Sequence, residues 1–225
     1  MFFVISVLLF FLPFFISDPF LNVYKDFNKA HGMLTSFIKF SVLATLGEII
    51  GLRIKSGVYY KEGFGVIPRA IVWGFLGLSI KMAFVIFAKG TPIFLSYLGV
   101  DGAGNAMAGE LSAVKVGVAL AISVSMNLIF APLMMTLHKI TDLHIISYEG
   151  KLSSMIKPIA FGSNLRNMDW DVQWNFVFKK TIPFFWIPAH TITFLLPPEY
   201  QVLFAAFLGI VLGILLALAS LMGTK

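Results

Sequence analysis

The sequence predicts an all-α protein, a multi-pass transmembrane bundle of about six helices, some of them kinked at proline. Its composition is the first reason: 58% of the 225 residues are hydrophobic and 12% are charged, whereas about 25% are charged in an average soluble domain. Residues 200–224 are the second, since they carry no charged side chain and about 20 apolar residues can cross a bilayer as a helix. The third is a ladder of small residues at every fourth position of that run. It consists of Ala205, Gly209, Gly213 and Ala217.

Such a ladder forms one stripe along a helix and lets a second helix pack closely against it. A similar ladder occurs upstream and consists of Ala113, Gly117, Ala121 and Ser125. We therefore expect tightly packed helices in a single membrane domain that covers residues 1–225. The two ladders are also candidate contacts for a homo-oligomer.

The expected spans are the apolar segments 2–17, 35–52, 67–88, 112–135, 176–196 and 200–222. Segment 2–17 lacks the basic start and the small-residue cleavage site of a secretory signal, so we expect a short first membrane helix, or alternatively one that lies along the interface. Pro132 and Pro183 predict kinks within their spans, because proline removes a backbone hydrogen bond. Pro197-Pro198 predicts a tight turn between the last two spans.

The two long connections have different compositions. Residues 136–175 mix apolar and charged side chains, which favours a partly amphipathic element on the membrane surface. Residues 89–111 contain the glycine-rich stretch "GVDGAGNAMAGE". This stretch lacks the Lys-Ser/Thr of a phosphate-binding P-loop, so we expect a flexible loop there.

Lys and Arg between the spans are unequally divided, and cytoplasmic loops usually carry the excess. Eight lie on one side of the predicted bundle, namely Arg53, Lys55, Lys61, Lys139, Lys151, Lys157, Arg166 and Lys225. Three lie on the other side, namely Lys25, Lys29 and Lys89. This asymmetry predicts that both termini are cytoplasmic. We also expect the protein to lie in the cell membrane.

Several function classes are disfavoured. The formal charge of +6 arises from Lys and Arg spread along the chain, so we expect a lipid bilayer and no nucleic acid as partner. The chain has no cysteine, which excludes thiolate metal sites and cysteine nucleophiles. His138, Asp142 and His144 could supply metal ligands, but no fourth ligand is evident, so a solvated helix end is the expected reading. We expect no cofactor, no metal and no enzymatic activity.

Ionisable side chains within membrane spans usually face a partner or a cavity, because exposing them to lipid is costly. Glu48 and Arg69 lie on consecutive spans, each within about two turns of the cytoplasmic face. We therefore expect an ion pair between them.

Lys81 and His190 each lie roughly 10 Å inside the opposite face. Together with Asn127 and Lys115 they are candidates for a polar lining of a pore or cavity. The alternative is that these residues are separately and locally paired, with Lys115 reaching the membrane surface.

Four motifs between residues 20 and 222 are similar to those of one membrane-protein family. They are "SVLATLGEII", "IPRAIVWGFLGLSIKMAFVIF", the dipeptide Met126-Asn127 followed by Pro132, and "WIPAHTITFLLPPEYQVLF". The chain resembles the family of the twenty-two-kilodalton peroxisomal membrane protein and its mitochondrial inner-membrane Mpv relatives, as a divergent bacterial member with helix 2–17 added. Glycine, proline and aromatic positions match, whereas Met126, His190 and Thr193 replace the Asp, Gln and Asn of the family pattern.

The resemblance implies a small-solute pore or its regulator. Our leading hypothesis is therefore a channel or carrier for small solutes, with anions favoured by the cationic side chains of Lys81, Lys115 and His190. The first alternative is a non-transporting membrane scaffold or assembly factor that binds a partner through the small-residue ladders. The second is a membrane-bound transferase that uses His138, Asp142 and His144.

Overall fold

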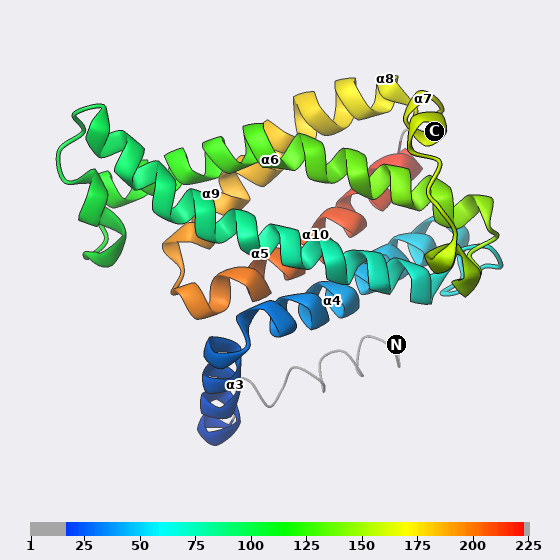
Figure 1. Ribbon diagram of the computed structural model, residues 1–225, viewed down its shortest axis with the longest axis horizontal. Helices are drawn as coiled ribbons and strands as arrows, with labels where there is room; N and C mark the ends of the chain where they lie inside the picture. The colour runs from blue at the N-terminus through cyan, green and yellow to red at the C-terminus, as the bar shows by residue number, and fades with distance from the viewer. Residues whose placement is uncertain (1–16, 223–225) are drawn as a thin grey trace.

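A computed structural model gives the fold, and the structure describes residues 17–222. All regular secondary structure between these residues is helical, so the expected all-α class is confirmed. Four helices of this part of the chain are long and apolar enough to cross a membrane, which fits an integral membrane protein. They are α4 (Gly32–Ser56), α5 (Val66–Tyr97), α6 (Ala113–Ser147) and α10 (Pro198–Met222), and they run lengthwise through the bundle in Figure 1.

Local sequence explains where these helices begin and end. Gly57 follows α4 with φ 75° and donates its N–H to Arg53 O, a left-handed termination that glycine adopts without strain. Ser112 caps the start of α6, since its hydroxyl accepts the N–H of Lys115 over 3.2 Å, as an N-cap serine does. The 32-residue α5 begins after Gly65, with Pro68 in its first turn, where a missing N–H costs nothing.

The expected span 176–196 falls in a helical run that has three parts. These are α8 (Trp170–Val172), the π-helix η3 (Gln173–Trp186) and α9 (Ile187–Leu195), which follow one another without a break. The helical backbone continues through Pro132 of α6 and Pro183 of η3. The expected helix 2–17, apart from its last residue, and Lys225 lie outside the described residues.

The connections are shorter than expected, because α5 and α6 continue beyond the predicted spans. With 35 residues, α6 is about 52 Å long, whereas the hydrocarbon core of a bilayer is about 30 Å thick. Between α6 and α8 the chain forms two short helices, η2 (Leu152–Ile156) and α7 (Phe161–Arg166), and the glycine-rich stretch forms η1 (Ala103–Ala108). Helix α3 (Asp18–Ala30) projects away from the bundle (Figure 1).

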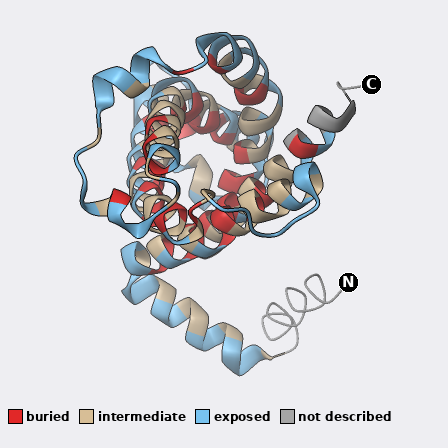
Figure 2. Cartoon of the chain, turned by 90° about the vertical axis from the view of Figure 1, so that its right-hand side faces the viewer, coloured by how far each residue is buried: buried red, intermediate tan, exposed pale blue. Residues whose placement is uncertain are grey.

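Buried side chains line the inward faces of the helices, and the outward faces are exposed (Figure 2). The buried apolar residues of the core come from α4, α5, α6, α9 and α10, together with Ala103 of η1. The core includes Phe40, Leu43, Ile80, Phe84, Ile122, Phe194 and Ala206.

The C-terminal small-residue ladder packs against α4 of the same chain. A Cβ on Gly213 would lie 2.9 Å from Gly47 O, and a Cβ on Gly47 would lie 3.0 Å from Ile210 Cα. Ala205 and Ala217 are buried as well. Close helix packing is therefore found within one chain, with α4 against Gly213 of the ladder, whereas a Cβ on Gly209 would have no neighbour within 4 Å.

Candidate functional site

One end of the bundle holds a cluster of ionisable side chains from three helices, which we call the charged cluster. It consists of Glu48 from α4, Arg69 from α5, and His138 and Asp142 from α6. Arg69 Nη1 lies 2.5 Å from Glu48 Oε2, and the same atom donates to Asp142 Oδ1. His138 Nε2 lies 3.2 Å from Glu48 Oε1. The expected Glu48–Arg69 ion pair is thus present and has two further members.

Neighbouring groups fix the orientation of the charged cluster. Trp73, one turn after Arg69 on α5, donates from Nε1 to Glu48 Oε1 over 2.8 Å. Arg69 Nε donates to Phe64 O over 2.7 Å, and only 6% of Arg69 is exposed. The arginine is therefore enclosed with a carboxylate or carbonyl partner on two of its nitrogens, as a buried guanidinium requires.

His144 does not join His138 and Asp142. The latter two are four positions apart and share a face of α6, whereas His144 turns away and its Nε2 lies 2.9 Å from Ser154 O. The three residues considered for a transferase or metal site therefore do not converge. Glu48 instead lies beside His138 and Asp142, and this grouping was not predicted from the sequence. The four-residue spacing of His138 and Asp142 was the available signal, because it places both side chains on one face of a helix.

Glu48, His138 and Asp142 place one ligand atom each within 4.8 Å of one another, which is compact enough for a metal ion. However, Arg69 Nη1 contacts both carboxylates. The guanidinium therefore occupies the position between the two carboxylates that a metal cation would take. The geometry favours a structural and electrostatic role for the charged cluster, in which it ties α4, α5 and α6 together.

The opposite end of the bundle contains a cavity of about 470 Å³ that we call the lysine cavity, within the usual volume range of small-ligand sites. Lys81 and Lys89 of α5 and Lys115 of α6 line it, and its lining includes no Asp or Glu. The other lining residues are Phe84, Val85, Ala88, Met107, Ile122, Phe194, Leu195, Leu196, Pro197, Pro198 and Gln201.

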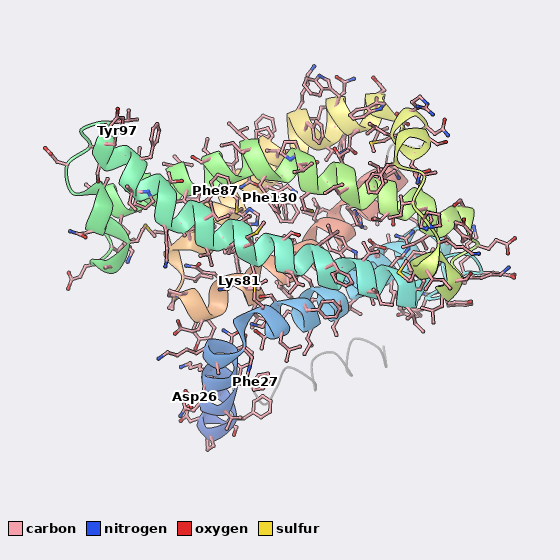
Figure 3. The ribbon with its side chains drawn as sticks, in the orientation of Figure 1. Asp26, Phe27, Lys81, Phe87, Tyr97 and Phe130 are labelled. Carbon is pink, nitrogen blue, oxygen red and sulfur yellow. The ribbon has the colours of Figure 1, made fainter. Side chains whose placement is uncertain are left out.

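Lys81 extends toward the start of α4. Its Cε lies 3.7 Å from the position that a Cβ on Gly32 would take, and Figure 3 shows Lys81 on the side of α5 near the start of α4 and the α9–α10 turn. Lys115 Nζ donates to Gly109 O over 2.7 Å. Lys89 is exposed, and because it stands just beyond the predicted span, we had counted it only as a topology signal.

His190 and Asn127 pair with each other behind the lysine cavity. Asn127 Nδ2 lies 3.1 Å from His190 Nδ1 and donates to Ser123 O over 2.8 Å. Neither residue lines the cavity, and both are buried. The expected lining by Lys81, Lys115, His190 and Asn127 is therefore divided: the lysines share a cavity and the other two form a local pair.

Two phenylalanines separate the lysine cavity from this buried pair. Phe84 and Phe194 both line the cavity, and their ring centroids lie 5.0 Å apart. The Phe84 ring also meets the His190 ring edge to face, with centroids 5.7 Å apart. The aromatic pair thus forms the floor of the cavity above the polar pair.

Comparison of the chain with protein-family models, curated proteins and solved structures finds no match in any of the three. The resemblance to the peroxisomal membrane protein family therefore stays a prediction from the four motifs.

Proposed function

We propose that this integral membrane protein is a channel or carrier for small anions, and that the lysine cavity is where the anion binds. One observation carries the proposal: Lys81, Lys89 and Lys115 converge on one cavity whose lining has no acidic residue. Three ammonium groups without a carboxylate give a positive potential, which attracts anions and concentrates them locally. The family resemblance, which implies a small-solute pore, is consistent with this assignment.

The order of side chains along the bundle supports a route through it. From the outer end of the bundle inward, Lys89 and Lys115 come first and Phe84, Phe194 and Lys81 follow. The His190–Asn127 pair and the charged cluster come last. Along α5, about 18 Å of helix separates Lys81 from Arg69. In this proposal the aromatic floor is the barrier, and its rings move aside when a solute passes.

We further propose that the lysine cavity opens on the outside of the cell membrane and that both termini are cytoplasmic. The positive-inside rule supports this orientation, because Arg53, Lys61 and Lys157 flank the end that holds the charged cluster. A structural observation keeps the scaffold as the second candidate. Gly117 on the upstream ladder is exposed and would tolerate a Cβ without any contact within 4 Å, so this stripe is open to a partner helix.

The test is anion flux from liposomes of zwitterionic lipid that contain the purified protein. Lys81→Met removes one charge from the cavity and should lower anion flux, and Lys81→Glu should shift selectivity toward cations. Lys29→Met is the matched control, because Lys29 is an exposed lysine of α3 at the same end of the bundle and does not line the cavity.

Equal anion flux and unchanged selectivity in both Lys81 variants, with each variant still monodisperse, would overturn the assignment of the lysine cavity as the anion-binding site. A wild-type protein that passes no solute at all while retaining its fold would favour the scaffold.

A further inference from the structure

A second hollow lies directly beside the lysine cavity, along the α4–α5 surface, and we call it the lateral groove. Its volume is about 550 Å³. It shares Lys81 and Val85 with the cavity, so the two hollows meet at these residues. Its remaining lining consists of Gly32, Met33, Leu78, Ser79, Met82 and Ile86.

The lateral groove is apolar and open at the surface of the bundle. Met33, Met82 and Ile86 are 50%, 52% and 56% exposed. These residues lie on two of the helices that can cross a membrane, so their exposed faces meet lipid chains when the protein is embedded. Among the residues 17–222 that line it, Lys81 is the one charged side chain.

We propose that an anionic phospholipid binds at this junction, with an acyl chain in the lateral groove and its phosphate among Lys81, Lys89 and Lys115. The inference deepens the proposed function and rests on it, because it assigns a partner to the same lysine cavity. A lipid that fills both the lysine cavity and the lateral groove must carry a negative headgroup and a long apolar tail.

Charge complementarity is the argument for the headgroup. A lysine next to an anionic lipid contributes favourable free energy that is lost when its charge is removed. Three lysines line the cavity, and no carboxylate is among its described lining residues. Lys81 stands where the two hollows meet, so its ammonium can reach the cavity while its methylene stem covers apolar surface, as lysine stems do near membrane interfaces.

The lateral groove is the argument for a lipid rather than a free anion. A free phosphate would gain no binding free energy from contact with Met33, Met82 and Ile86. An acyl chain fills such a groove, and the Lys81 stem lies beside Gly32 at its edge, with Cε 3.7 Å from the position that a Cβ on Gly32 would take. Bound lipid would then compete with small anions for the lysines and lower their flux.

The experiment measures lipid retention by native mass spectrometry on the full chain in detergent, with phosphatidylglycerol or phosphatidylcholine added. Wild type should retain phosphatidylglycerol preferentially. Lys81→Gln should weaken this binding about fivefold, the effect expected for one lysine beside an anionic headgroup. Lys89→Gln serves as a second variant if Lys81→Gln is not monodisperse, and Lys29→Gln is the control that should bind like wild type.

A groove variant and a soluble anion distinguish the lipid from a free anion. Met82→Gln makes the groove polar without touching the cavity, so it should weaken phosphatidylglycerol binding and leave binding of inorganic phosphate unchanged. Lysine variants should weaken both.

Three results would overturn the lipid proposal. They are equal retention of the two lipids by wild type, unchanged phosphatidylglycerol binding in Met82→Gln, and occupation of the groove by the chain's own residues 2–17, detected by cross-linking to Met33. The flux assay in zwitterionic liposomes is independent of these results, so the transport proposal can survive the failure of this one.

Discussion

Arg69 and Asp142 lie 73 positions apart in the sequence, yet Arg69 Nη1 donates directly to Asp142 Oδ1. The same nitrogen also contacts Glu48, so one arginine binds carboxylates from the helices on both sides of its own. The side chains of Arg69, Glu48 and Asp142 are 7%, 19% and 17% exposed. This contact therefore holds three helices in register at one end of the bundle.

Removal of Arg69 should lower the stability of the protein more than removal of either carboxylate. Arg69→Met leaves two enclosed carboxylates without their cation, and breaking a buried ion pair typically costs about 3–5 kcal/mol. Asp142→Asn leaves the Glu48 contact in place and should cost less. The measurement is thermal unfolding of the purified protein in detergent.

A double-mutant cycle on Glu48→Ala and Arg69→Ala tests the coupling directly. The double variant should be more stable than the sum of the single losses predicts. Lys151→Ala, which breaks the exposed Lys151–Glu149 pair, is the control and should leave the unfolding temperature unchanged. Strictly additive losses in the cycle would contradict the charged cluster as a stabilising unit.

The charged cluster shows what could be predicted from the sequence and what could not. Glu48 and Arg69 were predictable partners, because both are ionisable side chains at similar depth on consecutive apolar segments. The spacing of His138 and Asp142 indicated a shared helix face, but it did not indicate that this face meets Glu48 and Arg69, since the apolar run of α6 ends at residue 135 and the helix continues to Ser147. A hydropathy pattern locates the part of a helix that can contact lipid. It does not indicate how far the helix continues beyond its apolar run.

The lysine cavity illustrates a second limit. Depth along a helix follows from the rise per residue, which placed Lys81 and His190 at similar levels. The direction of each side chain depends on packing, and packing turned His190 toward Asn127. Lys89 lines the cavity together with the turn at Pro197-Pro198. The sequence does not reveal that this turn lies next to α5, so Lys89 was not predicted as a lining residue.

Packing between α4 and α10 should be disturbed by a branched side chain at Gly47. A Cβ there would lie 3.0 Å from Ile210 Cα and 3.1 Å from Gly209 O, so Gly47→Val must push the helices apart. Overpacking of this kind costs about 1–3 kcal/mol. Gly209→Ala is the matched control, because a Cβ on Gly209 has no neighbour within 4 Å. Equal unfolding temperatures for the two variants would contradict the close approach.

The two ends of the bundle should lie on opposite sides of the membrane. Because the chain has no cysteine, single cysteines can be introduced without a background signal. Cysteines at Lys61 and Lys157 should react with an impermeant thiol reagent only from the cytoplasmic side, and one at Asn105 of η1 only from outside. Labelling of Asn105 and Lys157 from the same side would exclude the proposed arrangement.

Phe84 should control passage between the lysine cavity and the His190–Asn127 pair. Its side chain is 3% exposed and contacts both Phe194 and His190. In the proposed route, Phe84→Ala opens the cavity floor, so anion flux from liposomes should rise while its dependence on Lys81 persists. The same change removes a buried ring and should lower stability by about 3–5 kcal/mol. Phe84→Leu keeps an apolar side chain there, and should give a smaller rise in flux with a smaller loss of stability.

The matched control is Phe87→Ala on the same helix, since Phe87 packs against the core without lining the cavity (Figure 3). That control should lose stability and keep wild-type flux. If Phe84→Ala and Phe87→Ala change flux equally, the aromatic floor is not the barrier and the route must run elsewhere.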